Sequence, residues 1–248
     1  CWSANSRSPL PEQQRIVNVI EALFAKLDRA RELLEEVQDA FEEQKATILA
    51  RAFRGELTAK WREEHCTDDP TKMIMILKEQ RINVARSGKE RDEIAAMYAS
   101  IDLLAQVRKD GWITLKASLI CENITCGNTP TGNIMDEGDI PFLKVYNIVD
   151  NAVDFIYKPQ FIDCETHSRK LKSSQLMPGD VIMNIVGPPL RKIAIIPNDY
   201  PEWNMNQAIV RFRPVGYVDS KYLYYCLLNP STLDDVIRET KGVVGQAN

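Results

Sequence analysis

The sequence predicts an α+β protein built from a long helix, a short helical connector and a globular head. Three observations predict this class. A heptad pattern of apolar residues fills the first part of the chain, shorter amphipathic helical patterns follow it, and β-rich runs separated by Gly, Pro and Asn fill the remainder. We therefore expect a spacer helix of the coiled-coil type at residues 11–56, a helical connector at 57–110 and a mixed α/β domain at 111–248.

The long helix has recognisable start and stop signals. Pro11 suits a first helical turn, Glu12 is favourable at the positive end of the helix dipole, and Gly55 suits a left-handed cap after Arg54. Neither Gly nor Pro interrupts the sequence between them. The predicted helix is about 43 residues and roughly 65 Å long at 1.5 Å per residue.

Apolar residues recur along this helix with a period close to 3.5, which is the geometry of a coiled coil. We call this stripe the helix seam. A core helix of a globular domain is the alternative, and the length of the helix and the charges at its other positions disfavour it. The seam consists of Ile16, Ile20, Leu23, Leu27, Leu34, Val37, Phe41 and Ile48.

The connector and the head are predicted from shorter patterns. Asp69 and Pro70 indicate the start of a helix that ends at Arg86, and a second helix is expected from Asp92 to Lys109. In the head, helices are expected at 219–228 and 232–239. Strands are predicted at 112–119, 140–148, 153–158, 180–187, 192–197 and 207–214.

Composition excludes several classes of protein. The 248 residues are 44% hydrophobic, enough for a sizeable core, but the apolar runs are too short and too interrupted to span a bilayer. No signal-peptide pattern opens the sequence, so a cytoplasmic location is expected. Six cysteines occur without a CxxC pair, which indicates reduced thiols.

Motifs for catalysis and metal binding are missing. His65, Cys66, Cys164 and His167 are residue types that bind zinc, but their spacing fits no structural zinc motif. The segment "NIVGPPLRK" at 184–192 resembles the motif of adenine-N6 methyltransferases only superficially, because a glycine replaces the acceptor and a leucine the aromatic residue. It is better interpreted as a turn. We expect no catalytic residue, no metal site and no cofactor in this chain.

Polar and basic residues at predicted loops and strand ends make the head a candidate for binding double-stranded DNA. The net charge is −4, but residues 143–213 carry nine bases against seven acids. Arg and Lys contact guanine edges or phosphates, and Asn and Gln pair with adenine. An ordinary solvated loop is the alternative for each residue. The candidates are Lys144, Tyr146, Asn147, Arg169, Lys170, Lys172, Asn184, Arg191, Lys192, Asn204, Asn206 and Gln207.

Several segments resemble the specificity (S) subunit of type I restriction-modification enzymes. "PLPEQQRIV", "IEALFAKLDRARELLEE" and "ILARAFRGELTAKWREEH" are similar to the central spacer helix of that family. "GDIPFLKVYNI", "LMPGDVIMNIVGPPLRKIAII" and "NMNQAIVRF" are similar to a target-recognition domain. Together these segments cover nearly the whole chain, apart from the connector between about residues 70 and 110.

The resemblance implies a non-catalytic subunit that reads one half of a bipartite DNA target and docks the methylation (M) subunits. Adenosylmethionine is then expected on the M subunits and ATP on the restriction (R) subunit. It also implies that the helix seam packs against an antiparallel spacer helix, supplied by a second copy or by a missing half of the subunit.

The sequence departs from the full family pattern because only one spacer helix and one recognition domain are present. A fragment, a truncated product and a half-length subunit that dimerises are all left open, as are the oligomeric state and the target bases. The alternative function is a coiled-coil assembly protein whose head binds protein.

Overall fold

The computed structural model describes residues 9–65, 69–102, 106–108 and 112–232. The chain divides into two compact units, residues 1–48 and 49–248. The long helix with a globular part that contains sheets confirms the predicted α+β class. Residues 233–239 of the predicted helix 232–239, Cys66 and the opening segment "CWSANSRS" lie outside the described residues.

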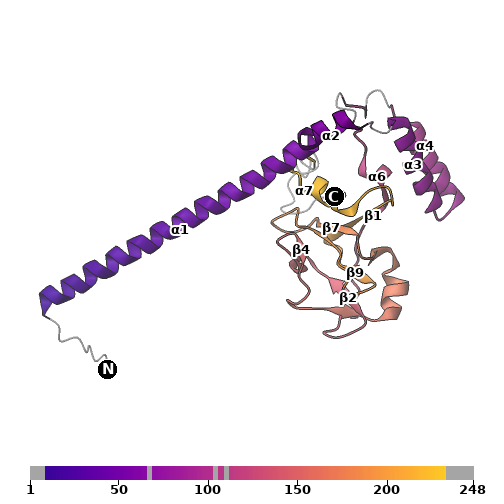
Figure 1. Cartoon of the computed structure of the whole chain (residues 1–248). Coiled ribbons are helices and arrows are strands. Elements are labelled where there is room, and N and C mark those ends of the chain that lie inside the picture. Colours follow the sequence, from indigo (N-terminus) through magenta and orange to yellow (C-terminus); the bar gives the residue numbers. More distant parts are fainter. Residues whose placement is uncertain (1–8, 66–68, 103–105, 109–111, 233–248) are drawn as a thin grey trace. The chain divides into compact units, whose positions relative to one another are not determined.

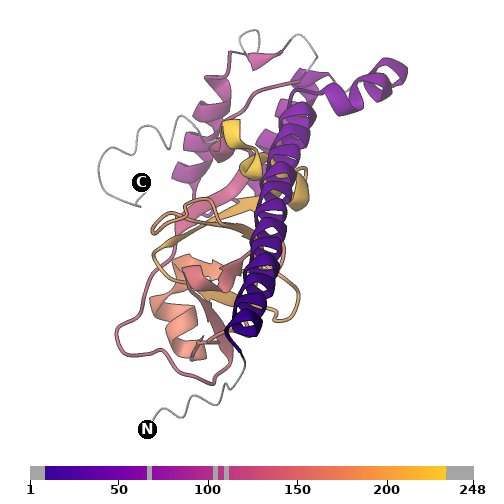
Figure 2. The same ribbon diagram turned by 90° about the vertical axis from the view of Figure 1, so that its left-hand side faces the viewer.

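Helix α1 runs without interruption over Leu10–Phe53, 44 residues (Figures 1 and 2). It ends where the sequence predicted, because Gly55 adopts the left-handed conformation at φ 82°. Ion pairs spaced three or four residues apart line its polar side, for example Arg31 with Glu35 at 3.1 Å. Such pairs stabilise an exposed helix by only about 0.2–0.5 kcal/mol each.

The predicted helix seam is exposed along α1. Its side chains keep between 43% of their surface (Ile20) and 70% (Leu34) accessible within this chain. None of the residues of α1 is buried. The helix therefore carries a continuous apolar stripe that packing within its own unit does not cover.

After α1, the helical elements are η1 (Glu56–Thr58), α2 (Ala59–Glu64), α3 (Pro70–Asn83) and α4 (Gly88–Ala99). The side chain of Asp69 caps α3 as predicted, accepting a hydrogen bond from the Thr71 amide at 2.9 Å. The second connector helix, predicted at 92–109, starts earlier and ends earlier, at Gly88 and Ala99, and Val107 instead forms an isolated bridge with Ile113. The hydroxyl of Ser87 accepts a hydrogen bond from the Glu90 amide and so caps the start of α4. Helices α3 and α4 lie side by side (Figure 1).

Two arginines hold the carbonyl oxygens at the end of α1. Arg108 donates to the oxygens of Phe53 and Arg54 at 2.9 and 3.2 Å, and Arg62 donates to that of Gly55 at 2.6 Å. Both guanidinium groups also lie over the Trp112 ring. The last carbonyls of a helix lack intrahelical donors, so these contacts stabilise the junction between α1 and the residues that follow.

The globular part contains two four-stranded sheets and one short hairpin. The first sheet has the order β1-β10-β7-β8 and is antiparallel. The second has the order β5-β2-β9-β6, in which β2 and β9 run parallel. The strands are β1 (Cys121–Cys126), β2 (Ile140–Leu143), β3 (Ile148–Val149), β4 (Ala152–Val153), β5 (Phe161–Ile162), β6 (Gln175–Leu176), β7 (Val181–Asn184), β8 (Ile193–Ile195), β9 (Trp203–Met205) and β10 (Ile209–Pro214).

Short helices lie before, between or after these strands. They are α6 (Ala117–Ile120), η2 (Val145–Asn147), the π-helix η3 (Thr166–Lys170), η4 (Lys172–Ser174), α7 (Ser220–Leu228) and η5 (Pro230–Thr232). Helix α7 confirms the helix predicted at 219–228, and Asp219 caps it by accepting a bond from the Tyr222 amide at 2.9 Å.

Two predicted strands are wrong. In residues 112–119 only Ile113 forms an isolated bridge, and helix α6 begins within the segment, while the strand itself is β1 just beyond it. In residues 153–158 only Val153 belongs to a strand, because a tight turn follows it. The strands predicted around β2, β7, β8 and β10 are confirmed.

The core is continuous across the connector and the head. Ile74, Leu77 and Tyr98 from α3 and α4 share one buried cluster with Leu119 and Val215. The Tyr98 hydroxyl also donates to the carbonyl of Leu119. Helices α3 and α4 are therefore packed parts of the same unit as the sheets.

Candidate nucleic-acid interface

The ends of several strands from the two sheets lie together at one edge. Strands β2 and β9 are parallel, with Leu143 opposite Met205 at their ends (Figure 1). The three residues 206–208 then lead from β9 into β10. The Asn206 amide donates to the Leu143 carbonyl at 3.0 Å, which ties this connection to the end of β2. The segments that follow β2 and β9 are consequently neighbours.

Strands of the first sheet bring further loops to the same edge. The start of β10 pairs with the end of β7, where Ile209 lies opposite Asn184, and with the end of β1. Strand β8 starts there because Ile193 lies opposite Met183. Strand β6 also starts there, since Gln175 lies opposite Asn204. We call this region the loop edge, and it comprises residues 127–129, 144–147, 172–174, 184–192 and 205–208.

Charge distinguishes the loop edge from the rest of the chain. Its five segments contain four basic residues, Lys144, Lys172, Arg191 and Lys192, and no acidic residue. The whole chain has a net charge of −4. A local excess of four positive charges on an acidic protein favours binding of an anionic partner.

Three of the predicted DNA-binding residues are buried asparagines. Asn147, Asn184 and Asn204 expose at most 1% of their surface. Asn184 donates to the carbonyls of Val186, Gly187 and Pro189 and accepts from the Lys192 amide at 2.8 Å. These hydrogen bonds occupy the side-chain amide of Asn184 and hold the β7–β8 loop in position. Burial therefore goes against a base contact by any of these three side chains in this structure.

The prediction that "GPP" forms a turn is confirmed. Gly187 has φ 86°, a left-handed value, and the segment lies between β7 and β8. Arg191 closes the loop: its guanidinium donates to the carbonyls of Asn229 and Pro230 at 3.0 and 2.9 Å. This arginine, predicted as a base reader, also holds the loop against the end of α7.

Arg169, Lys170 and Lys172 are exposed on η3 and η4. Arg169 pairs with Glu165 at 3.0 Å on the surface. Gln207 is exposed and accepts a hydrogen bond from the Thr129 hydroxyl, whereas Lys144, Tyr146, Lys192 and Asn206 are partly buried. The structure thus brings the predicted residues to the loop edge or directly beside it.

Gly127 permits this close assembly. A Cβ atom at this position would meet the carbonyl oxygens of Met205 and Asn206, well inside van der Waals contact. Without the side chain, the amides of Gly127 and Asn128 donate to Ile209 and Met205. The sequence gives no signal for this requirement, because the crowding comes from a strand that is distant in the chain.

His167 holds the basic π-helix against β9. Its Nδ1 atom lies 3.0 Å from the Asn204 side-chain nitrogen, so Nδ1 accepts and Nε2 carries the hydrogen. Nε2 lies 3.3 Å from a carboxylate oxygen of Glu202. Burial lowers the pKa of His167 below its ordinary value, and the charge of Glu202 opposes this shift.

We expect His167 to make folding stability fall in mild acid. The unfolded chain takes up the proton at a pH near 6.5, whereas the folded chain resists it, so stability is complete above about pH 6.5 and declines below it. The free energy of unfolding in urea, measured for the whole chain between pH 5 and pH 8, checks this. His167→Gln should flatten the decline. His65→Gln, which changes the other histidine, an exposed one, should keep the decline. If the two variants show the same dependence of the unfolding free energy on pH, His167 is not its cause.

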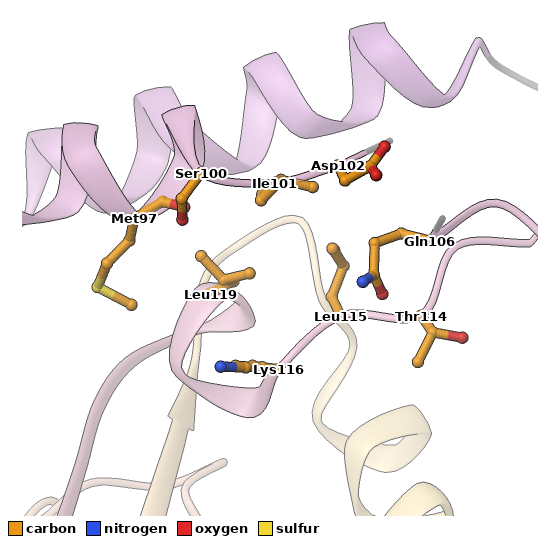
Figure 3. A pocket seen from close by; sticks show the side chains of 9 residues that line it. All are labelled: Met97, Ser100, Ile101, Asp102, Gln106, Thr114, Leu115, Lys116 and Leu119. Atoms are coloured by element: carbon orange, nitrogen blue, oxygen red, sulfur yellow. The ribbon is translucent and has the colours of Figure 1, made fainter. Parts of the chain in front are cut away.

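A pocket of about 300 Å³ lies elsewhere, between the end of α4 and α6 (Figure 3). Its lining includes Met97, Leu115 and Leu119 together with Asp102 and Lys116. Helix α6 leads into the start of β1, and the loop edge lies beyond the end of that strand. The pocket is therefore no part of the loop edge.

Within the described ranges, no helix is long and apolar enough to span a membrane. No cluster of three or more His, Cys, Asp or Glu side chains able to hold a metal ion occurs among those residues either.

Comparisons with known proteins identify relatives. No family model matches the chain. The EcoDI specificity subunit of Escherichia coli, a type I restriction enzyme subunit, is 46% identical over 57 residues, which are 23% of this chain and 13% of that protein. The StySPI specificity subunit of Salmonella potsdam is 44% identical over 57 residues, 23% and 12% of the two chains.

The fold extends the likeness to nearly the whole chain. A solved structure from a study of complex assembly and conformational transition of the type I R-M system matches 97% of this chain with a TM-score of 0.54 and 18% identity. The chain spans 45% of that protein. At this identity the match shows a shared fold. With the sequence matches, it confirms the predicted resemblance of this chain to the specificity subunits of type I restriction enzymes.

Proposed function

We propose that this chain recognises DNA for a type I restriction-modification complex and that the loop edge reads one half of a bipartite target. The observation that carries the proposal is the gathering of four bases and no acid at one edge of the sheets. The relatives, which are specificity subunits of type I restriction enzymes, support it.

Different side chains have different tasks in this proposal. The exposed Arg169, Lys170 and Lys172, with Lys144 and Lys192, contact phosphates and supply most of the affinity. Gln207, Asn206 and Tyr146 contact base edges and supply discrimination. The buried Asn147, Asn184 and Asn204 keep the loops in position, and Arg191 combines a loop-holding contact with a place at the edge.

The exposed helix seam of α1 is proposed to pack against a second, antiparallel spacer helix, from another copy of this chain or from another part of a longer subunit. Its apolar stripe is continuous and exposed, which supports a helical partner. The M subunits dock on the same assembly and hold adenosylmethionine, while the R subunit holds ATP. This chain itself is proposed to be non-catalytic.

The experiment is DNA binding by the full chain assembled with its M subunits, at several salt concentrations. The target is first read from the methylation pattern of cells that carry the complete system. Tight, salt-sensitive binding of the target duplex and weak binding of a scrambled duplex are expected. DNA binding that depends neither on the duplex sequence nor on the salt concentration would contradict the proposal. It would favour an assembly protein whose head binds protein.

A further inference from the structure

The turn at residues 154–158, "DFIYK", projects an apolar side chain at the loop edge. Ile156 exposes 93% of its surface, more than any other large apolar side chain in the described part of the chain. Its neighbour Phe155 points the opposite way and packs edge-on against Trp203 and Phe161, with ring centroids 5.3 Å apart in both pairs. The partly buried ring anchors the turn, and the exposed isoleucine forms its tip.

Hydrogen bonds fix this turn. The carboxylate of Asp154 accepts from the amides of Ile156 and Tyr157 at 3.0 and 3.4 Å. The buried Asn147 donates to the carbonyls of Asp154 and Tyr157 at 3.1 and 3.2 Å. Because the backbone on both sides of Ile156 is held, the exposure of this side chain is imposed by the structure. A fixed apolar tip loses little conformational freedom when it binds a partner.

Two tyrosine rings and a lysine lie next to the tip. The Tyr146 and Tyr157 rings pack edge to face, and the ammonium of Lys158 lies 5.0 Å from the centre of the Tyr157 ring. Lys158 has φ 49°, an uncommon value for this residue type, and its carbonyl accepts a bond from the Tyr146 hydroxyl at 3.3 Å. The Asp154 carboxylate is bonded to backbone amides at the start of the turn, and the exposed Lys158 places a positive charge at its end.

The turn lies beside the loop edge. It is bonded to Asn147 of η2, which follows β2, and it leads into β5, whose Phe161 pairs with Pro141 of β2. An apolar tip with an exposed lysine, Lys158, at the end of the same turn fits a groove that presents methyl groups between two lines of phosphates. The C5-methyl of thymine is the apolar feature of the DNA major groove.

We infer that the 154–158 turn is a reading element of the DNA interface, in which Ile156 contacts the methyl group of a thymine and Lys158 contacts a neighbouring phosphate. This inference rests on the proposed function, because it names a contact within that interface. Burial of the turn against a protein is the competing outcome.

Replacing thymine by uracil in the target duplex removes only the methyl group, and so tests the contact directly. Each thymine of the recognised half is replaced in turn, and binding by the assembled complex is measured at physiological salt. One replacement should weaken binding by the wild-type chain about fourfold, the effect of one buried methyl group. Ile156→Ala should bind the thymine duplex four- to tenfold more weakly and bind both duplexes equally.

Met177→Ala is the matched control, since Met177 is an exposed apolar residue beyond the other end of β6. It should keep the preference for thymine. If no replacement by uracil weakens wild-type binding, or if Ile156→Ala keeps the same preference, the inference is wrong. A loss of complex assembly in Ile156→Ala with unchanged DNA preference would assign the turn to a protein contact. Failure of the wild-type complex to prefer its target would instead refute the proposed function.

Discussion

Replacing Lys144, Lys172 and Lys192 together by glutamine is expected to weaken binding of target DNA by roughly ten- to a hundredfold at physiological salt. Each lysine that contacts a phosphate releases about one counterion, so the slope of log affinity against log salt should become shallower by up to about three. Discrimination between target and scrambled duplex should persist, because phosphate contacts carry no sequence information.

The measurement is fluorescence anisotropy with the assembled complex over a range of salt concentrations. A triple variant of exposed lysines on α2, α3 and α4, Lys60→Gln with Lys72→Gln and Lys89→Gln, is the control. Both variants change the net charge equally, from −4 to −7 by loss of three charges. Equal losses of affinity in the two variants would show that only the total charge matters and would refute the loop edge as the interface.

Asp180→Ala is expected to destabilise the globular unit by about 3–5 kcal/mol, the usual cost of removing one partner from a buried ion pair. Asp180 is 2% exposed and accepts two hydrogen bonds from Arg213, at 2.7 and 2.6 Å, and one from the Met177 amide at 2.8 Å. The pair holds the far part of β10, the strand that starts at the loop edge.

The neighbouring Arg211 enlarges this effect. It is 3% exposed and its hydrogen bonds go to uncharged groups, among them the side chains of Asn123 and Thr125. Burial and the charge of Arg213 together lower the pKa of Arg211 to about 10, while the charge of Asp180 opposes the shift. Without Asp180, two adjacent guanidinium groups would share a poorly solvated site.

Denaturant unfolding of the whole chain tests this prediction. Glu165→Ala removes the acid of the exposed Arg169–Glu165 pair, whose side chains are 78% and 73% exposed, and it should cost at most about 1 kcal/mol. A loss for Asp180→Ala that is no larger than the loss for Glu165→Ala would contradict the structural role assigned to the buried pair.

The candidate interface was predictable by segment and much less by residue. The fold brings most of the candidate residues to neighbouring strand ends, and polar residue types after buried strands are a local signal that the sequence contains. The roles of Asn147, Asn184 and Asn204 could not be predicted. An asparagine that reads a base and one that bonds to backbone carbonyls look identical in a sequence. The sequence predicts a strand at the 154–158 turn because Phe155, Ile156 and Tyr157 are residue types that favour strands.

The sequence by itself determined the long helix, its end at Gly55 and its exposed seam, because heptad spacing and capping act over a few residues. It also determined the α+β class and the resemblance to type I specificity subunits. Only the tertiary structure decided which strand ends meet, which amides are buried, why position 127 must be glycine, and that Ile156 points outward. These features depend on pairings between residues far apart in the chain, such as β1 with β10 and β2 with β9, which no local pattern encodes.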